Sequence, residues 1–251
     1  MNSKERFSDR VDHYVKYRPS YSEAVIQYLY HTVGFTASSR IADIGAGTGI
    51  FTRLLLEQGS EVVAVEPNAD MRQAAVDQSS GNPKFRAESG SAEETGLADH
   101  SVDYIVCAQS FHWFDRAAAK AEFNRILKPG GKVVLIWNSR ITTGTPFLEG
   151  YDLLLRTYGI DYEQVGHKNI SEDALTPFFK DGGLHKATFP LEQRLNYEQL
   201  QGRMSSSSYV PLPGHPNYEP LMEQLRQLFG STEEDGFISF DYETEVYWGE
   251  V

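Results

Sequence analysis

The sequence is poor in cysteine, in positive charge and in long apolar runs. Cys107 is the one cysteine, so no disulfide can form within the chain. It lies in the apolar run YIVCAQ without a basic neighbour, which predicts a buried strand residue and not a catalytic thiol. Lys and Arg number 23 against 35 Asp and Glu, a net charge of -12. This charge argues against nucleic acid as a partner, because its phosphates attract Lys and Arg.

No stretch of about 18 apolar residues occurs, and the opening MNSKERFSDR has no apolar segment typical of a signal peptide. These absences predict a soluble, cytoplasmic protein without a membrane partner, either a monomer or a homodimer. His13, His167, His185 and His215 lack the spacing of metal ligands, so we expect no metal. The 40% of hydrophobic residues is enough for a sizeable core.

The most informative segment that is present is a glycine turn. The apolar run Ile41–Ile44 is followed by glycines at 45, 47 and 49, and then by the helix-compatible run IFTRLLLEQ. A strand that enters a glycine turn and opens a helix brings the backbone close to a ligand. A second apolar run, Glu61–Val65, precedes Glu66, whose carboxylate is placed to bind both hydroxyls of a ribose. Together these features predict an adenosine-containing cofactor.

The spacing of the turn argues against a dinucleotide. The dinucleotide fingerprint is GxGxxG, whereas here the third glycine comes one residue earlier and Asp43 lies beside the first. No Arg or Lys occurs between Ile41 and Thr52 to meet a pyrophosphate. A nicotinamide-dependent oxidoreductase is therefore an alternative that the spacing disfavours.

Four segments in order resemble the motifs of the class I S-adenosylmethionine-dependent methyltransferases. They are Asp43–Gly49, Val62–Asn68, Ser89–Leu97 with Ser101–Val106, and Arg125–Ile136. The resemblance covers about residues 35 to 140. Within that family, YVKYRP at 14–19 and QSFHWFD at 109–115 are similar to the small-molecule branch that includes trans-aconitate methyltransferase.

The resemblance implies an α/β fold: a doubly wound, mostly parallel seven-stranded Rossmann-like sheet, with an antiparallel C-terminal edge strand and a helical insertion. We expect an N-terminal helical lid at 1–34, the cofactor-binding core at 35–140, and completion of the sheet at 141–251 with an insertion at about 197–230. The alternation of apolar runs and helical patterns agrees with parallel strands and crossover helices.

Individual elements follow from the same patterns. Strands are predicted at Arg40–Ile44, Glu61–Val65, Pro83–Glu88, Val102–Ala108, Lys132–Ser139, Lys186–Leu195 and Phe237–Val251. Helices are predicted at Glu23–Val33, Ile50–Gln58, Ala69–Gln78, Arg116–Leu127, Phe147–Tyr158, Ser171–Lys180, Tyr197–Met204 and Asn217–Phe229. The last two strands are expected to pair with each other in an antiparallel manner.

The cofactor site is predicted from the ends of the first strands. Asp43 either orients the glycine loop or meets the ammonium group of the cofactor, or else it is a structural cap. Met71 either contacts the adenine or belongs to the core. The resemblance implies that Ser91 stands where relatives often carry an aspartate against the adenine amino group. The predicted cofactor residues are Asp43, Gly45, Ala46, Gly47, Glu66, Pro67, Met71, Ser91, Ala92 and Gln109.

The acceptor site has fewer local signals. His112 follows Gln109 closely and is either a general base or a residue that orients the substrate, and Trp113 is expected to wall the site. The 14–19 segment resembles the family's lid, in which Arg18 would bind a carboxylate bidentately or else be an exposed charge. The predicted substrate residues are Tyr14, Tyr17, Arg18, His112, Trp113, Arg203 and Tyr209.

The sequence thus predicts methyl transfer from S-adenosylmethionine to a small molecule, at an oxygen of a carboxylate or a hydroxyl. Only a hydroxyl would need a general base, because a carboxylate is already ionised at neutral pH. A second alternative is a protein that binds the cofactor without catalysis.

Overall fold

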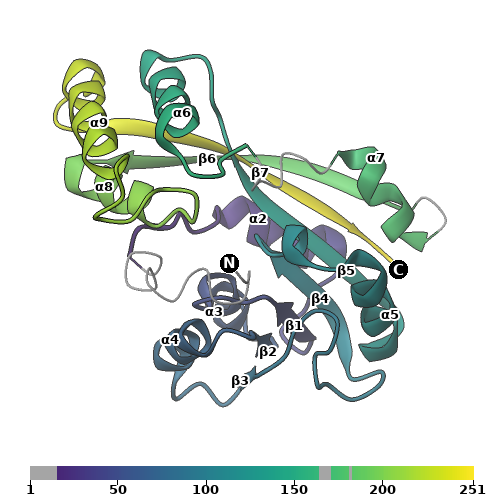
Figure 1. Cartoon of the computed structure of the whole chain (residues 1–251). Helices are drawn as coiled ribbons and strands as arrows, with labels where there is room; N and C mark the ends of the chain where they lie inside the picture. The colour runs from purple at the N-terminus through teal and green to yellow at the C-terminus, as the bar shows by residue number, and fades with distance from the viewer. Residues whose placement is uncertain (1–15, 164–170, 181–182) are drawn as a thin grey trace.

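The apolar runs of the first half form the parallel strands of one sheet. In a computed structural model, which describes residues 16–163, 171–180 and 183–251, these are β1 (Arg40–Ile44), β2 (Glu61–Val65), β3 (Phe85–Glu88), β4 (Val102–Ala108) and β5 (Leu127–Arg140). Their order in the sheet is β3-β2-β1-β4-β5 (Figure 1). The direction of winding reverses between β1 and β4, which is where open α/β sheets bind ligands.

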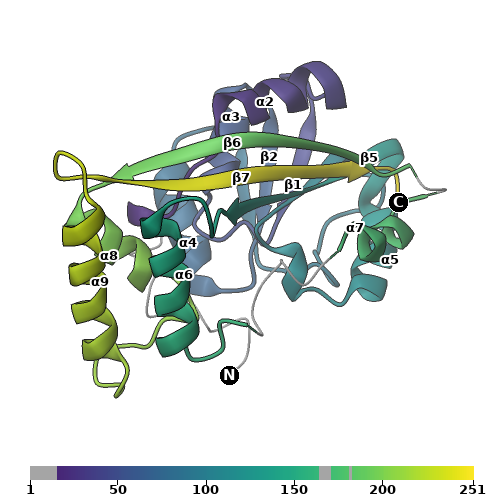
Figure 2. The same cartoon turned by 90° about the horizontal axis from the view of Figure 1, so that it is seen from above.

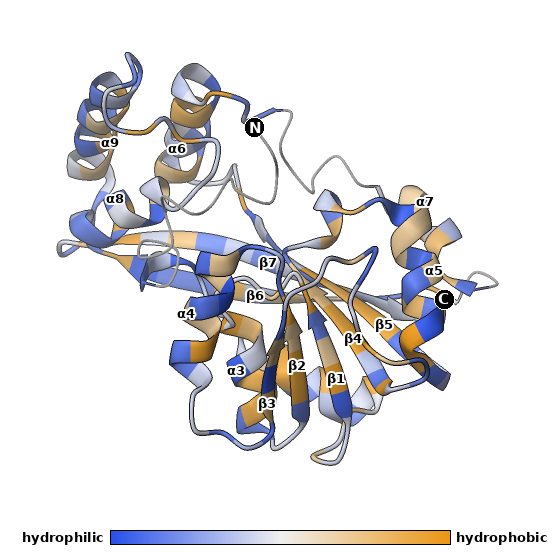
Figure 3. Ribbon diagram, turned by 60° about the horizontal axis from the view of Figure 1, so that its bottom comes forward, coloured by the Kyte–Doolittle hydropathy of each residue, from blue (hydrophilic) through white to orange (hydrophobic). Residues whose placement is uncertain are grey.

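Helices cover both faces of the parallel strands. One face packs against α2 (Glu23–Tyr28), the π-helical turn Leu29–Val33 that continues it, and α3 (Ile50–Glu57). The other face packs against α5 (Arg116–Ile126), α7 (Glu172–Leu175) and the 3-10 turn Thr176–Phe178. The remaining helix of this half, α4 (Ala69–Ser79), connects β2 to β3. In Figure 3 the strands are mainly hydrophobic, as expected for a parallel sheet buried on both faces.

The two C-terminal strands complete a seven-stranded sheet. The last, β7 (Ile238–Gly249), inserts between β5 and β6 (His185–Leu195) and runs antiparallel to both, so β6 forms the edge. The predicted α/β class and the antiparallel pairing of the last two strands are confirmed. The order of the strands means that β7 reaches β5 across a long stretch of intervening chain.

The second half carries its own small core. Helices α6 (Pro146–Tyr158), α8 (Tyr197–Ser205) and α9 (Tyr218–Thr232) gather at one end of β6 and β7, away from α5 and α7 (Figures 1 and 2). Their apolar sides pack together and against Leu195, Ile238 and Phe240 of the two strands. This helical unit stands beside the parallel core and forms one side of the space between them. The division into segments 1–34, 35–140 and 141–251 stays a prediction, and residues 1–15 lie outside the described residues.

Most predicted elements agree with the structure, and the differences have local causes. Strand β5 begins at Leu127, not at Lys132, because Leu127 already pairs with Val102 of β4. Pairing resumes at Tyr104 and Lys132, and the KPGG residues at 128–131 form an irregularity in the ladder between these two pairs. The helix predicted at Ser171–Lys180 is confirmed only as α7 and a 3-10 turn that contains Pro177, a residue that disfavours a continuous helix. Ser171 caps α7 by accepting a hydrogen bond from the Ala174 amide. Within the described residues, no helix combines the length and apolar character needed to cross a bilayer.

Candidate functional site

A cavity of about 180 Å³ opens at the C-terminal ends of β1, β2 and β4. This is the point at which the sheet reverses its winding, so the topology and the cavity agree. The structure brings most of the predicted site residues together along its wall: Arg18, Asp43, Gly45, Ala46, Gly47, Glu66, Pro67, Met71, Ser91, Ala92, Gln109, Trp113 and Arg203.

The glycine turn after β1 approaches the cavity with its backbone. Gly45 has a φ of +68°, and a Cβ there would lie 2.6 Å from the Cβ of Ser110. The two segments are joined by the Ser110 hydroxyl, which donates to the Ile44 carbonyl at 2.6 Å. Gly47 also has a positive φ, +58°, but the nearest atom to its added Cβ is the Met71 sulfur at 3.9 Å. Gly45 therefore allows close packing, whereas Gly47 keeps the cavity floor free of a side chain.

Glu66 lies at the end of β2 with only 8% of its surface exposed. Its Oε2 accepts a hydrogen bond from the Gly47 amide at 2.9 Å, and its Oε1 accepts one from the Asn68 amide at 2.9 Å. Burial raises the pKa of the Glu66 carboxyl, although these two amides oppose the shift. Each carboxylate oxygen keeps a further lone pair for a ligand hydroxyl. The contact between Gly47 and Glu66 fixes the turn relative to the second strand.

Asp43 is fully buried beside the glycine turn. Its Oδ2 accepts from the Thr52 hydroxyl at 2.6 Å, whereas its Oδ1 has no hydrogen-bond partner. Burial raises the pKa of this carboxyl to about 7. The hydrogen bond from Thr52 agrees with Asp43 as a structural cap, whereas the unpartnered Oδ1 agrees with Asp43 as a cofactor contact. The role of Asp43 toward a ligand stays a prediction.

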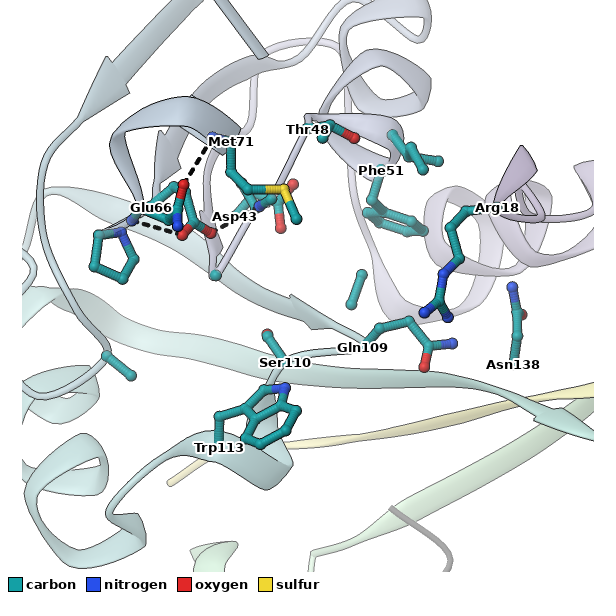
Figure 4. A pocket seen from close by; sticks show the side chains of 18 of the residues that line it. Arg18, Asp43, Thr48, Phe51, Glu66, Met71, Gln109, Ser110, Trp113 and Asn138 are labelled. Atoms are coloured by element: carbon teal, nitrogen blue, oxygen red, sulfur yellow. Dashed lines mark hydrogen bonds between the residues drawn. The ribbon is translucent and has the colours of Figure 1, made fainter. Parts of the chain in front are cut away.

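Residues from α4 and the loop after β3 line the next part of the cavity. Asn68 caps α4 by accepting from the Met71 amide at 3.0 Å, which directs Met71 toward the glycine turn (Figure 4). Ser91 and Ala92 line the same region. The loop is tied down by Glu93, whose carboxylate accepts from the Asp115 amide at 2.9 Å. A sulfur and a small apolar side chain at this position suit a flat ring.

The exit from β4 turns sharply into the site. Gln109 has a φ of +61°, a conformation unusual for a non-glycine residue, and its amide donates to the Ile136 carbonyl at 2.8 Å. Its side chain extends toward Arg18 and Asn138, and Trp113 stands on the neighbouring wall (Figure 4). Both residues line the cavity, and their predicted roles toward cofactor and substrate stay predictions.

His112 is not among the residues that line the cavity. Its Nδ1 accepts from the Trp137 indole at 3.4 Å. In a neutral imidazole this contact assigns the ring proton to Nε2. The base role of His112 stays a prediction.

The remaining predicted substrate residues are dispersed. Tyr14 lies outside the described residues. Tyr17 packs on α8, where its ring would lie 2.2 Å from a Cβ added at Gly202, and its hydroxyl donates to Glu198 at 3.2 Å. Tyr209 packs against Tyr162 at 5.0 Å between ring centroids. Tyr17 and Tyr209 support the walls of the cavity without lining it, whereas Arg18 and Arg203 line it.

Several lining residues were missed by the sequence analysis. Thr48, in the glycine turn itself, has a buried hydroxyl without a hydrogen-bond partner. Asn138, like Gln109, lies near the C-terminal end of a parallel strand, where open α/β sheets bind ligands. The reasoning that predicted Gln109 could therefore have predicted Asn138 as well. Tyr242 comes from β7, and only the pairing of Arg140 with Tyr242 brings it here. The other missed lining residues include Tyr21, Phe51, Ser110 and Phe114.

The residues present fit S-adenosylmethionine. The Glu66 carboxylate can accept hydrogen bonds from ribose hydroxyls, and Gly47 leaves space above the turn. The Asp43 Oδ1 and the Thr48 hydroxyl have no hydrogen-bond partner and could bind polar groups of the cofactor. The fold and this site together define a class I S-adenosylmethionine-dependent methyltransferase. A sequence model of the methyltransferase domain matches residues 42–135.

Similar proteins place the chain in the same class. A methyltransferase-like protein of Schizosaccharomyces pombe is 33% identical over 205 residues, which cover 81% of this chain and 78% of the relative. A methyltransferase of Mycobacterium bovis is 42% identical over 137 residues, but the match covers 53% of this chain and 52% of that protein. This chain belongs to the S-adenosylmethionine-dependent methyltransferases.

Solved structures agree on the fold. The structure of a putative type II methyltransferase from Anaeromyxobacter dehalogenans has a TM-score of 0.71 at 22% identity, and the match covers 93% of this chain and 97% of that one. The similarity extends through both the parallel core and the helical unit. Because the chain belongs to this family, S-adenosylmethionine is its cofactor, and the predicted class, fold and methyl donor are confirmed.

Proposed function

We propose that this protein transfers the methyl group of S-adenosylmethionine to an oxygen of a small-molecule acceptor, a carboxylate or a hydroxyl. One observation carries the proposal: the cavity that contains Glu66 and the glycine turn continues without interruption to Arg18, Asn138 and Arg203. A cofactor and an acceptor bound in one cavity can meet with their reacting atoms in line.

The bound cofactor supplies an electrophilic methyl group on a positively charged sulfur. The task of the chain is then alignment and exclusion of water. Gln109 lines the cavity, and its unusual backbone conformation at the end of β4 holds the side chain toward Arg18 and Asn138 (Figure 4). Trp113 and Phe114 close the neighbouring wall with apolar surface. These residues would hold the acceptor oxygen in position without taking part in proton transfer.

The proton requirement favours a carboxylate over a hydroxyl acceptor. An ionised carboxylate attacks without a base, whereas a hydroxyl must lose a proton. The candidate base, His112, receives the Trp137 indole at Nδ1 and lies off the cavity wall. Arg18 and Arg203, by contrast, line the cavity and would attract an anion.

Transfer of a labelled methyl group tests this function. The protein is incubated with methyl-labelled S-adenosylmethionine and a panel of small carboxylic acids, phenols, alcohols and amines, and the products are identified by mass. We expect label in an ester or an ether, and loss of transfer in Glu66→Ala. Label found only on nitrogen or carbon would contradict the assignment to oxygen.

The two alternatives give different results in the same samples. Binding of S-adenosylhomocysteine by calorimetry without transfer to any class of acceptor would favour a non-catalytic binding protein. Fluorescence titration with NADH tests the alternative of a nicotinamide-dependent oxidoreductase, which none of the cavity residues described above favours. Saturable NADH binding that excludes S-adenosylhomocysteine would overturn the proposal.

A further inference from the structure

Arg203 is a buried positive charge without a carboxylate partner. Only 5% of its surface is exposed, and it reaches the cavity from α8. No Asp or Glu of the described residues lies within ion-pair distance of its guanidinium. The nearby buried Arg140 differs, because its Nη2 pairs with Asp152 at 2.6 Å. Buried charges are normally paired, so the missing partner of Arg203 requires an explanation.

Neutral groups hold the guanidinium by two of its donors. Its Nε donates to the Tyr242 hydroxyl at 2.9 Å, and its Nη1 donates to the Ser207 hydroxyl at 3.0 Å. A guanidinium has five N–H donors. Those not bonded to Tyr242 and Ser207 have no acceptor in the described part of the chain.

The orientation of Arg203 is set by a chain of contacts through the two antiparallel strands. The Tyr242 hydroxyl on β7 accepts from Arg203 and in turn donates to the Gln193 side chain on β6 at 3.0 Å. The guanidinium carbon also lies 5.6 Å from the centre of the Phe240 ring. A planar cation fixed in this way is prepared for a partner of defined geometry.

A second guanidinium adds to the positive potential. Arg18 lines the same cavity and donates from Nη2 to the Ser206 carbonyl, at the C-terminal end of α8, at 2.9 Å. Burial acts to raise the pKa of the Tyr209 phenol, but the combined effect of Arg203, Arg18, a hydrogen bond from Ser207 and Arg140 brings that pKa below its usual value. The lowered pKa of the Tyr209 phenol thus reflects the same positive potential that a bound anion would experience.

We propose that Arg203 is the counter-ion of a carboxylate group on the methyl acceptor, and that Tyr242 and Gln193 are positioning residues for its guanidinium. This deepens the proposed function and rests on it for the identity of the ligand as acceptor. A carboxylate suits the site because its two oxygens match the parallel donors of a guanidinium. Arg203 then lacks a carboxylate partner in the ligand-free protein because its guanidinium is kept for an anionic ligand.

Anion binding is measured on protein saturated with S-adenosylhomocysteine, so that cofactor binding is controlled separately. Calorimetry compares acetate and benzoate with their neutral analogues acetamide and benzamide. We expect the wild type to bind benzoate at least tenfold more tightly than benzamide. In Arg203→Met this preference should be lost, and in Arg203→Lys it should be partly retained. Arg53→Met, which removes an exposed charge outside the cavity, is the control for net charge.

Stability distinguishes a binding role from a structural one. An unpaired buried charge replaced by an apolar side chain of similar size often leaves a protein as stable or more stable. We therefore expect the melting temperature of ligand-free Arg203→Met to equal or exceed that of the wild type. A melting temperature several degrees lower, with the preference for benzoate intact, would overturn the proposal, because Arg203 would then be structural.

The positioning role has its own comparison. Tyr242→Phe keeps the ring but removes the acceptor of the Arg203 Nε, so we expect benzoate affinity to fall threefold to tenfold with affinity for S-adenosylhomocysteine unchanged. Tyr247→Phe, at a hydroxyl on the same strand that bonds to Glu245, is the matched control and should have no effect. Equal effects of the two variants would remove Tyr242 from this role.

The remaining outcomes are also decisive. Absence of benzoate and acetate binding in the wild type, or binding of inorganic phosphate with the carboxylates excluded, contradicts a carboxylate site. If benzoate binding depends on Arg203 but no acceptor is methylated, the anion site stands and the proposed function fails. If transfer occurs equally well in Arg203→Met for every acidic acceptor, the function stands and the counter-ion proposal fails.

Discussion

The two ends of the cavity differ in charge and in the way in which the chain builds them. The cofactor end is made from turns after adjacent parallel strands, and Gly47 and Glu66, which bond each other, are 19 residues apart. The acceptor end brings Arg18 to Ser206 across 188 residues, and Arg203 to Tyr242 across 39. The first end carries buried carboxylates, and the second carries guanidiniums.

This difference shows how one cavity can discriminate between two ligands. Asp43 and Glu66 lie at the cofactor end, where burial raises the pKa of both carboxyls, and a bound cation would favour their ionised forms. Arg18 and Arg203 create a positive field at the other end. If the acceptor is an anion, as proposed above, the guanidiniums favour it at their end of the cavity.

The largest expected effect comes from breaking the cofactor end alone. In Glu66→Ala, two hydrogen-bond acceptors for the ribose are lost, and the Gly47 and Asn68 amides lose theirs. Because hydrogen bonds to a charged group contribute about 1.5–3 kcal/mol each, we expect affinity for S-adenosylhomocysteine to fall by at least about 100-fold in calorimetry. Glu88→Ala, at the exposed end of β3 outside the cavity, is the control. Similar affinities in the two variants would remove Glu66 from the cofactor site.

Gly47→Ala tests whether the glycine turn after β1 leaves space for the cofactor. A side chain at this φ of +58° costs about 1–2 kcal/mol of stability, and its methyl group would project into the space kept for the cofactor. Gly81 has a φ of +90° with no atom within 4 Å of an added Cβ. Gly81→Ala should therefore lose similar stability in thermal denaturation but keep cofactor affinity. Equal cofactor affinity in both alanine variants would mean that the space at Gly47 is not used.

The pH dependence of stability tests the buried carboxyl of Asp43. Its folded pKa of about 7 lies above the usual 3.8, so between these values the native state binds a proton that the unfolded state does not. Stability of the ligand-free protein should therefore fall as the pH rises from about 4 to 7, with a slope of up to about 1.4 kcal/mol per pH unit. Asp43→Asn should flatten this slope in urea titrations. Asp77→Asn, at an exposed carboxyl of α4, is the control, and equal slopes in both variants would contradict the assignment.

The smallest expected effect concerns the wall of the acceptor end. Alanine in place of a helical glycine stabilises by about 1 kcal/mol when space allows. Gly230 in α9 has no atom within 4 Å of an added Cβ, so Gly230→Ala should raise the melting temperature. In Gly202→Ala the methyl group would overlap the Tyr17 ring, and we expect no gain or a loss. Adding Tyr17→Ala to Gly202→Ala should restore the gain; if it does not, Tyr17 is not the obstacle.

The same contrast explains how much could be predicted from the sequence. The cofactor end was predictable because strand, turn and acidic residue are close in the chain: β1 and β2 agree with their predicted bounds, and Glu66 lies where the pattern places it. Arg203 and Arg18 were predicted to bind substrate and do line the cavity. Their roles remain proposals.

What could not be predicted depends on distant pairing. Tyr242 and Gln193 look like ordinary alternating strand residues, and only the register of β6 and β7 brings them together near Arg203. The early start of β5 is similar, since a KPGG segment normally predicts a turn before the strand, and only the pairing of Leu127 with Val102 of β4 extends the strand across it. The contact of His112 with Trp137 joins a 3-10 turn to β5, and no local sequence pattern predicts it.

The interior position of β7 also has a consequence for the order of folding. Every partner of β7 precedes it in the chain: β5 lies about one hundred residues earlier, and β6 lies on the far side of α8 and α9. Until β7 inserts, β5 and β6 both present unpaired edges, which are prone to associate with other chains. During synthesis, the cofactor end can form while the acceptor end still lacks Tyr242. We expect a nascent protein that binds its methyl donor before it acquires the wall that selects the acceptor.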